Sequence, residues 1–86
     1  MKIRIPTSLL SYTGSLSVVD ASGSTLEQIS RDLDRKYPGI RFRIIDEQDQ
    51  IRAHVKIFLN GNQILDLSAK IADLDEIEIL QAFSGG

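Results

Sequence analysis

Two stretches of the chain alternate between apolar and polar residues, a period that is typical of half-buried β-strands. Residues 2–5 place two isoleucines on one side and two cations on the other, whereas residues 53–59 alternate valine, isoleucine and leucine with histidine, lysine and phenylalanine. Asn60-Gly61 follows the second stretch directly, and this dipeptide favours a type I′ hairpin turn. We therefore expect the chain to return over residues 63–65 as a short strand.

Two further strands complete the predicted sheet. Residues 15–19 follow a turn expected at residues 12–14, so they should form an N-terminal hairpin with residues 2–5. Residues 76–80 are the final predicted strand, in which two isoleucines point inward and two glutamates and a leucine point outward.

A single amphipathic helix is predicted from Ser24 to Tyr37. Its apolar residues recur at positions i, i+3 and i+7, which places them in one stripe that must lie against another element. Ser24 and Glu27 have the spacing of a capping box, which marks the start of a helix. Pro38-Gly39 supplies the stop signal at the other end.

Residues 40–50 show no clear period. Phe42, Ile44 and Ile45 are expected to cover one edge of the core. The acidic residues that follow them are expected to lie in a solvated loop.

The order of the elements is two strands, a helix and three strands, which favours an α+β fold. A helix cannot bury its apolar stripe alone, so we expect it to pack across a mixed sheet of four to five strands. The first and last strands should lie side by side at the centre of the sheet and run parallel. Residues 1–81 are expected to form this domain, and residues 82–86 a flexible C-terminal tail.

Composition narrows the class of protein. A chain of 86 residues, 42% hydrophobic and 26% charged, fits one globular domain with a modest core. Its net charge of -2 lacks the basic excess of a nucleic-acid binder, and no apolar run is long enough to cross a membrane. The chain has no cysteine, which excludes disulfides and thiolate chemistry and fits a cytoplasmic protein.

The side chains offer little for catalysis or for metal binding. His54 is the sole histidine and falls on the outer face of a predicted strand. Most carboxylates outside the helix group in two predicted loops, and neither group has the spacing of a calcium loop. The glycines before residue 85 stand singly rather than in a phosphate-binding loop. We therefore expect no catalytic residue, no metal site and no bound cofactor.

Gly85-Gly86 at the end of the sequence has two interpretations. Glycine loses much conformational entropy when it is ordered, so the pair could simply be a frayed end. Alternatively, the carboxylate of Gly86 is itself the reacting group, because two residues without side chains can thread a narrow channel. The five residues 82–86 span about 17 Å when extended, enough to enter the active site of another protein.

The Gly-Gly pair belongs to a set of short motifs that covers nearly the whole chain. The other motifs are Ile5-Pro6-Thr7, Tyr12-Thr13-Gly14, Ala21-Ser22-Gly23-x-Thr25-Leu26, Val55-x-Ile57-x-Leu59 before Asn60-Gly61, and Asp73-x-Asp75-Glu76-Ile77-x-Ile79. The set resembles the ubiquitin-like sulfur carriers of the MoaD/ThiS family, and among them most closely the carriers of the thiocarboxylate-dependent cysteine synthesis pathway.

This resemblance implies a β-grasp (ubiquitin-like) fold and a sulfur carrier that is not an enzyme. It implies that an ATP-dependent adenylating enzyme of the E1-like type activates the Gly86 carboxylate, which sulfur then converts to a thiocarboxylate. The tail residues Phe83, Ser84 and Gly85 would carry this group to a sulfur-accepting synthase. The acceptor would be a cysteine synthase, the large subunit of molybdopterin synthase or a thiazole synthase.

Two features indicate where partners would bind. Phe58 and Leu80 are apolar residues expected on the outer face of the sheet, and Phe83 is an apolar residue of the tail, so these three are candidates for partner binding. Residues 57–86 carry one lysine and five carboxylates, a net charge of -4, which would steer this half toward a basic partner.

Two alternatives to the sulfur carrier stay open at this point. In the first, an activated Gly86 forms an isopeptide bond with a lysine of a target, as in a ubiquitin-like protein modifier. In the second, the domain is a non-covalent interaction module whose terminal glycines have no role.

Overall fold

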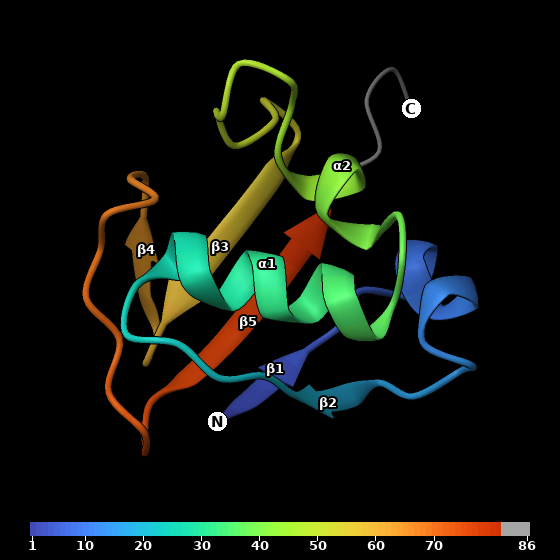
Figure 1. Cartoon of the computed structure of the whole chain (residues 1–86), viewed down its shortest axis with the longest axis horizontal. Helices are drawn as coiled ribbons and strands as arrows, with labels where there is room; N and C mark the ends of the chain where they lie inside the picture. Colours follow the sequence, from blue (N-terminus) through green and yellow to red (C-terminus); the bar gives the residue numbers. More distant parts are fainter. Residues whose placement is uncertain (82–86) are drawn as a thin grey trace.

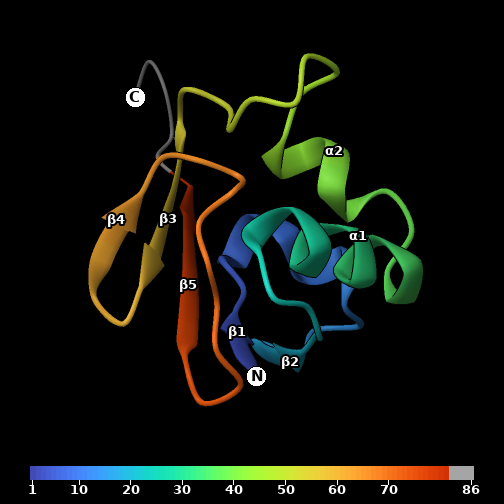
Figure 2. The same ribbon diagram turned by 60° about the vertical axis from the view of Figure 1, so that its left-hand side comes forward.

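The computed structural model describes residues 1–81, in which a five-stranded mixed sheet is covered on one face by two α-helices (Figures 1 and 2). The elements in chain order are β1 (Lys2–Arg4), the 3₁₀ helix η1 (Thr7–Tyr12), β2 (Val18–Asp20), α1 (Leu26–Lys36), α2 (Ile40–Ile44), β3 (Val55–Leu59), β4 (Asn62–Ile64) and β5 (Glu76–Gln81). The strands are ordered β2-β1-β5-β3-β4 across the sheet. This arrangement confirms the predicted α+β class and its β-grasp topology.

The first and last strands lie side by side in the sheet, as predicted. β1 and β5 run parallel with Ile3 opposite Ile77, and β5 runs antiparallel to β3 with Ile79 opposite Ile57. β5 therefore has a hydrogen-bonded neighbour on each side, which holds it more firmly than an edge strand.

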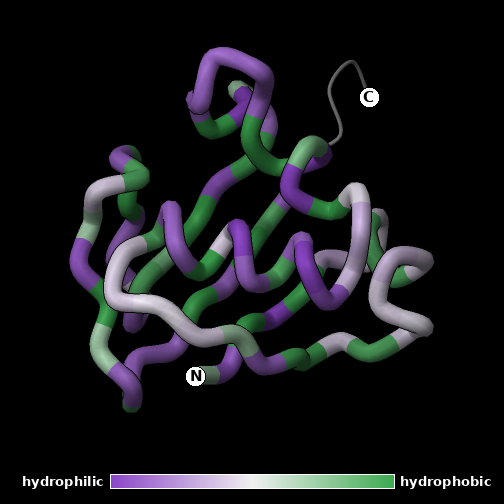
Figure 3. The backbone as a smooth tube through the Cα atoms, in the orientation of Figure 1, coloured by the Kyte–Doolittle hydropathy of each residue, from purple (hydrophilic) through white to green (hydrophobic). Residues whose placement is uncertain are grey.

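The core lies between the sheet and α1. The inward isoleucines of β1, β3 and β5 are each at most 4% exposed and face the apolar stripe of α1, formed by Leu26, Ile29 and Leu33. Figure 3 shows the corresponding alternation of hydrophobic and hydrophilic residues along the chain. The apolar periodicities thus correctly predict which faces are buried.

The connection between β1 and β2 contains a turn close to the predicted position, and also a helix that the pattern does not predict. It contains η1, whose Leu9 is only 1% exposed and fills the core next to the sheet. The turn comes after η1, where Gly14 and Ser15 both have positive φ. Because the turn occupies residues 13–15, the second strand covers residues 18–20 rather than 15–19.

The N-cap of α1 lies one residue later than predicted, and the helix itself covers Leu26–Lys36 rather than residues 24–37. Thr25 is the N-cap, and its hydroxyl accepts a hydrogen bond of 3.2 Å from the backbone N–H of Gln28. Gln28 in turn accepts from the backbone N–H and the hydroxyl of Ser24. Thr25 and Gln28 have the same spacing as Ser24 and Glu27, so the spacing alone does not decide which residue caps the helix. The backbone decides it, because the N–H of Ile71 donates to the Ser24 carbonyl.

Residues 40–50 contain a short helix that the pattern does not predict. Ile44 and Ile45 are buried, as expected, whereas Phe42 is 54% exposed and does not cover the core. The Phe42 ring instead lies under the guanidinium of Arg52, which is 4.5 Å from the ring centroid. The acidic residues Asp46, Glu47 and Asp49 do lie in a loop after α2.

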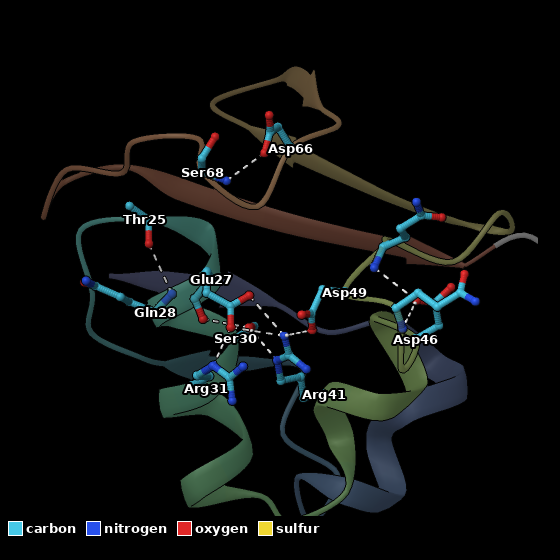
Figure 4. A network of polar contacts seen from close by, with 12 residues as sticks. Thr25, Glu27, Gln28, Ser30, Arg31, Arg41, Asp46, Asp49, Asp66 and Ser68 are labelled. Carbon is cyan, nitrogen blue, oxygen red and sulfur yellow. Dashed lines mark hydrogen bonds and ion pairs between the residues drawn. The ribbon is translucent and has the colours of Figure 1, made fainter.

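Arg41 of α2 joins this loop to α1 (Figure 4). Its guanidinium bonds to both carboxylate oxygens of Glu27, to Asp49 and to the hydroxyl of Ser30. Burial by itself would lower the pKa of Arg41, but the hydrogen bonds to Glu27 and Asp49 outweigh it and raise the pKa. Glu27, predicted to cap the helix, therefore ties α1 to α2.

The Asn60-Gly61 turn joins β3 to β4, and both residues have positive φ, as a type I′ turn requires. The Asn60 side chain also holds the start of β5: its oxygen accepts from the N–H of Glu76, and its NH₂ donates to Asp75, both at 2.9 Å. Asp75 accepts a second bond, of 2.7 Å, from the N–H of Ala72. The bond from Ala72 and the bond from Asn60 lower the pKa of Asp75.

The Thr25→Ala variant tests the position of the helix cap. Losing the hydroxyl that accepts from Gln28 should lower the free energy of unfolding by about 1 kcal/mol, measured by urea denaturation. Thr25→Ser should keep most of the stability. Ser24→Ala is the matched control and should cost less; a larger loss at Ser24 than at Thr25 would show that the cap lies at Ser24.

The lowered pKa of Asp75 predicts a dependence of stability on pH. The ionised carboxylate stabilises the fold fully above the pKa that Asp75 has in the unfolded chain, and this contribution is lost as the pH falls from about 4 toward the lower pKa of the folded state. Asp75→Asn should therefore flatten the decline of the urea midpoint below about pH 4. Part of the decline should remain in the Asp75→Asn variant, because hydrogen bonds also lower the pKa values of Asp66 and Asp32.

Asp73→Asn removes the same charge two residues away and controls for the change in net charge. If both variants show the same profile, the bonds to Ala72 and Asn60 do not carry the effect.

Candidate functional site

The candidate site is the end of β5 together with the outer face of the sheet, which α1 does not cover. Gln81 is the last described residue and lies opposite Val55 of β3. On the other side, the hydroxyl of Ser8 in η1 donates a hydrogen bond to the side-chain oxygen of Gln81. The chain therefore enters residues 82–86 from a strand that is fixed from both sides.

The tail residues predicted to react or to reach the partner lie outside the described residues. These are Gly86, Gly85, Ser84 and Phe83. Their predicted roles stay predictions, and the structure bears on them only through the position of Gln81.

Phe58 and Leu80 lie on the outer face, as predicted. Leu80 is 43% exposed, and Phe58 is partly buried. In the register of β3 and β5, Leu80 is opposite Lys56 and Phe58 is opposite Glu78, so the two apolar side chains are diagonal neighbours on adjacent strands. The register thus brings together two of the three residues predicted to bind a partner.

A groove of about 310 Å³ lies beside the end of β5, and the sequence does not predict it. One wall comes from Pro6, Thr7 and Ser8, which lead from β1 into η1, and the other comes from Leu80 and Gln81. The groove exists because η1 brings Ser8 next to Gln81, 73 positions later in the chain. No local pattern carries that information.

The carboxylates of residues 57–81 do not gather around Gln81. Asp75 and Glu76 lie where β5 begins, at the opposite end of the sheet from Gln81. The carboxylate of Asp66 accepts a hydrogen bond from the N–H of Ser68, two residues later, and this bond lowers its pKa (Figure 4). On the outer face, Lys2 lies opposite Glu76 and Arg4 opposite Glu78, so charges of both signs alternate there.

The described residues show no arrangement typical of catalysis. His54 is exposed. Within residues 1–81, no three His, Cys, Asp or Glu side chains are placed to hold a metal ion, and no helix there is long and apolar enough to span a bilayer. A hollow of about 460 Å³ beside β3 and β4 contains Asp49 and Arg52, but these groups already bond to Arg41 and Phe42.

Comparison with solved structures shows the same fold over almost the entire chain. A chain in the crystal structure of the Amycolatopsis orientalis BexX/CysO complex superposes with a TM-score of 0.91 at 30% identity, covering 99% of this chain and 98% of that chain. The crystal structure of Mycobacterium tuberculosis CysO gives a TM-score of 0.90 at 34% identity, covering 95% and 98%. The small archaeal modifier protein 1 of Methanosarcina acetivorans gives 0.80 at 26% identity, covering 99% and 94%.

Sequence comparison agrees with the structural likeness. The sulfur carrier protein CysO of Mycobacterium bovis and that of Mycobacterium tuberculosis are each 37% identical over 89 residues, which cover 98% of this chain and 96% of the relative. The model of the ThiS family matches residues 3–86, a range that includes both the domain and the Gly-Gly pair. The fold, the full-length relatives and this match together show that the chain belongs to the ThiS family.

Proposed function

We propose that this protein is a sulfur carrier whose Gly86 carboxylate is converted to a thiocarboxylate and then donates sulfur to a biosynthetic acceptor. The observation that carries the proposal is the match to the ThiS family, which extends through residue 86 and so includes the proposed reacting group. The 37% identity to sulfur carrier proteins over 98% of the chain supports the same role. The protein is then a cosubstrate of other enzymes rather than a catalyst.

The chemistry begins from an unreactive group. A carboxylate repels nucleophiles and lacks a good leaving group, so the Gly86 carboxylate must first attack the α-phosphate of ATP, forming an acyl-adenylate and releasing pyrophosphate. Sulfide, or a persulfide on a donor protein, then attacks the acyl carbon and displaces AMP; in the persulfide case a thiol must next reduce the resulting acyl disulfide. The thiocarboxylate that remains on Gly86 is the carried sulfur. ATP is a substrate of the adenylating partner in this scheme.

The described residues fit a protein that is bound and modified by partner enzymes. The outer face of the sheet and the groove beside β5 offer a docking surface, and β5 fixes the position from which residues 82–86 start. The chain has no cysteine, so sulfur cannot be carried as a side-chain persulfide and must be held on the C-terminal carbonyl.

Three acceptors fit the chemistry: a cysteine synthase, the large subunit of molybdopterin synthase and a thiazole synthase. We favour the cysteine synthase, because the N-terminal motifs of the chain resemble the cysteine-synthesis carriers and the 37%-identical relatives bear the name CysO. The modifier alternative has less support, since the archaeal modifier shares the fold at only 26% identity.

The proposal is tested by the intact mass of the protein after incubation with its adenylating enzyme, ATP and sulfide. The expected product is heavier by the difference between one sulfur and one oxygen atom, and fragmentation should place the added mass on Gly86. Omission of ATP and deletion of Gly86 are the controls, and each should abolish the shift. An unchanged mass, or Gly-Gly remnants on lysines without any thiocarboxylate, would overturn the sulfur-carrier role.

The predicted docking role of Phe58 and Leu80 is tested by truncating each side chain to alanine. Leu80→Ala and Phe58→Ala should each raise the KM of the adenylating enzyme for the carrier by about tenfold, because apolar side chains at the centre of an interface often contribute more than 1 kcal/mol to binding. Leu74→Ala is the matched control for Leu80→Ala, since Leu74 is 96% exposed and lies just before the start of β5, far from Leu80 at its other end. Equal KM values for Leu80→Ala and Leu74→Ala would exclude Leu80 from the interface.

A further inference from the structure

Arg4 lies on the outer face of the sheet, at the end of β1. β1 lies between β2 and β5, and the register places Arg4 between Val18 and Glu78. Three separate hollows share Arg4 as a lining residue. They are the groove beside Gln81, a hollow of about 110 Å³ toward Phe58, and one of about 90 Å³ toward Val18.

The guanidinium of Arg4 has unused hydrogen-bonding capacity. Within residues 1–81, Arg4 makes no side-chain hydrogen bond and no ion pair, although Glu78 is its neighbour in the register. Four of the other five arginines donate to a carboxylate or a carbonyl oxygen; these are Arg31, Arg35, Arg41 and Arg52. The fifth, Arg43, lies on α2, whereas the sheet separates α2 from the outer face.

The surroundings of Arg4 would strengthen a bond to an incoming acidic group. Val18 is 41% exposed and Leu80 43%, and these two residues, with Pro6 and Phe58, line the hollows that Arg4 also lines. A partner that covers these side chains excludes water, which makes a charge-assisted hydrogen bond stronger than in bulk solvent. The planar guanidinium also matches a carboxylate with two parallel hydrogen bonds, and arginines at the centre of an apolar ring are frequent anchors of interfaces.

We propose that Arg4 anchors the adenylating enzyme, which inserts an extended segment into the groove beside Gln81 and presents an aspartate or glutamate carboxylate to the guanidinium. This inference rests on the proposed function, because it takes the partner to be the enzyme that activates Gly86. The position of the groove suits this partner. An enzyme that binds residues 82–86, which span about 17 Å at most, must lie against the surface next to Gln81.

The test compares two cations on the same strand and the same face. Arg4→Gln and Lys2→Gln each remove one positive charge from β1, two positions apart, and both side chains are exposed. Arg4→Gln should raise the KM for the carrier by about tenfold with kcat little changed, whereas Lys2→Gln should change KM by less than about threefold. Urea denaturation and circular dichroism would verify that both variants keep the fold.

Two further measurements separate the anchoring role from a structural one. Glu78→Gln removes the carboxylate beside Arg4 and should lower KM, because the charge of Glu78 repels an incoming carboxylate. Added salt should raise the KM of the unmodified carrier more steeply than that of Arg4→Gln, because the screened interaction is already absent in the variant.

The outcomes distinguish this inference from the function on which it rests. If the unmodified carrier is not converted to a thiocarboxylate, the proposed function fails and the inference falls with it. If conversion proceeds and Arg4→Gln behaves like Lys2→Gln, the inference alone is overturned. Dimerisation of the free carrier that Arg4→Gln abolishes would assign the groove to a second copy and would likewise overturn it.

Discussion

The parallel pairing of β1 with β5 is the constraint on which the rest of the structure depends. Parallel neighbours cannot be joined by a hairpin, so the chain between residues 4 and 76 must leave the sheet and return to it. That excursion supplies α1, which covers the isoleucine face, and the β3–β4 hairpin, which pairs with the free side of β5. The same pairing places the last described residue, Gln81, beside the segment that leads out of β1.

Much of the fold follows from local patterns, because α1 and every strand except β4 bury one face. The Asn-Gly turn is equally local, since positive φ at two successive positions favours those residues. The missed features have tertiary causes. The choice between Ser24 and Thr25 as the N-cap is settled by contacts with residues 70 and 71, and α2 has only five residues, too few to establish a helical period.

The candidate site likewise has features that the sequence predicts and features that depend on tertiary contacts. The alternation in β3 and β5 predicts that Phe58 and Leu80 face outward, and the family resemblance predicts the role of Gly86. The groove beside Gln81 escapes prediction because its walls come from opposite ends of the sequence. Arg4 escapes for a related reason: the pattern places a cation on the outer face, but only the arrangement of neighbouring strands shows that its guanidinium is unpaired among residues 1–81.

The position of β5 in the sheet also has a consequence for biosynthesis. During translation, residues 76–81 leave the ribosome after all other strands, yet they pair with both β1 and β3. Until they emerge, the β1–β2 and β3–β4 pairs and α1 have their apolar faces exposed, and contacts between such distant segments form slowly. Closure of the sheet is therefore a late event, and a chain truncated before β5 would lack the strand that joins β1 to β3 and would present no complete outer face.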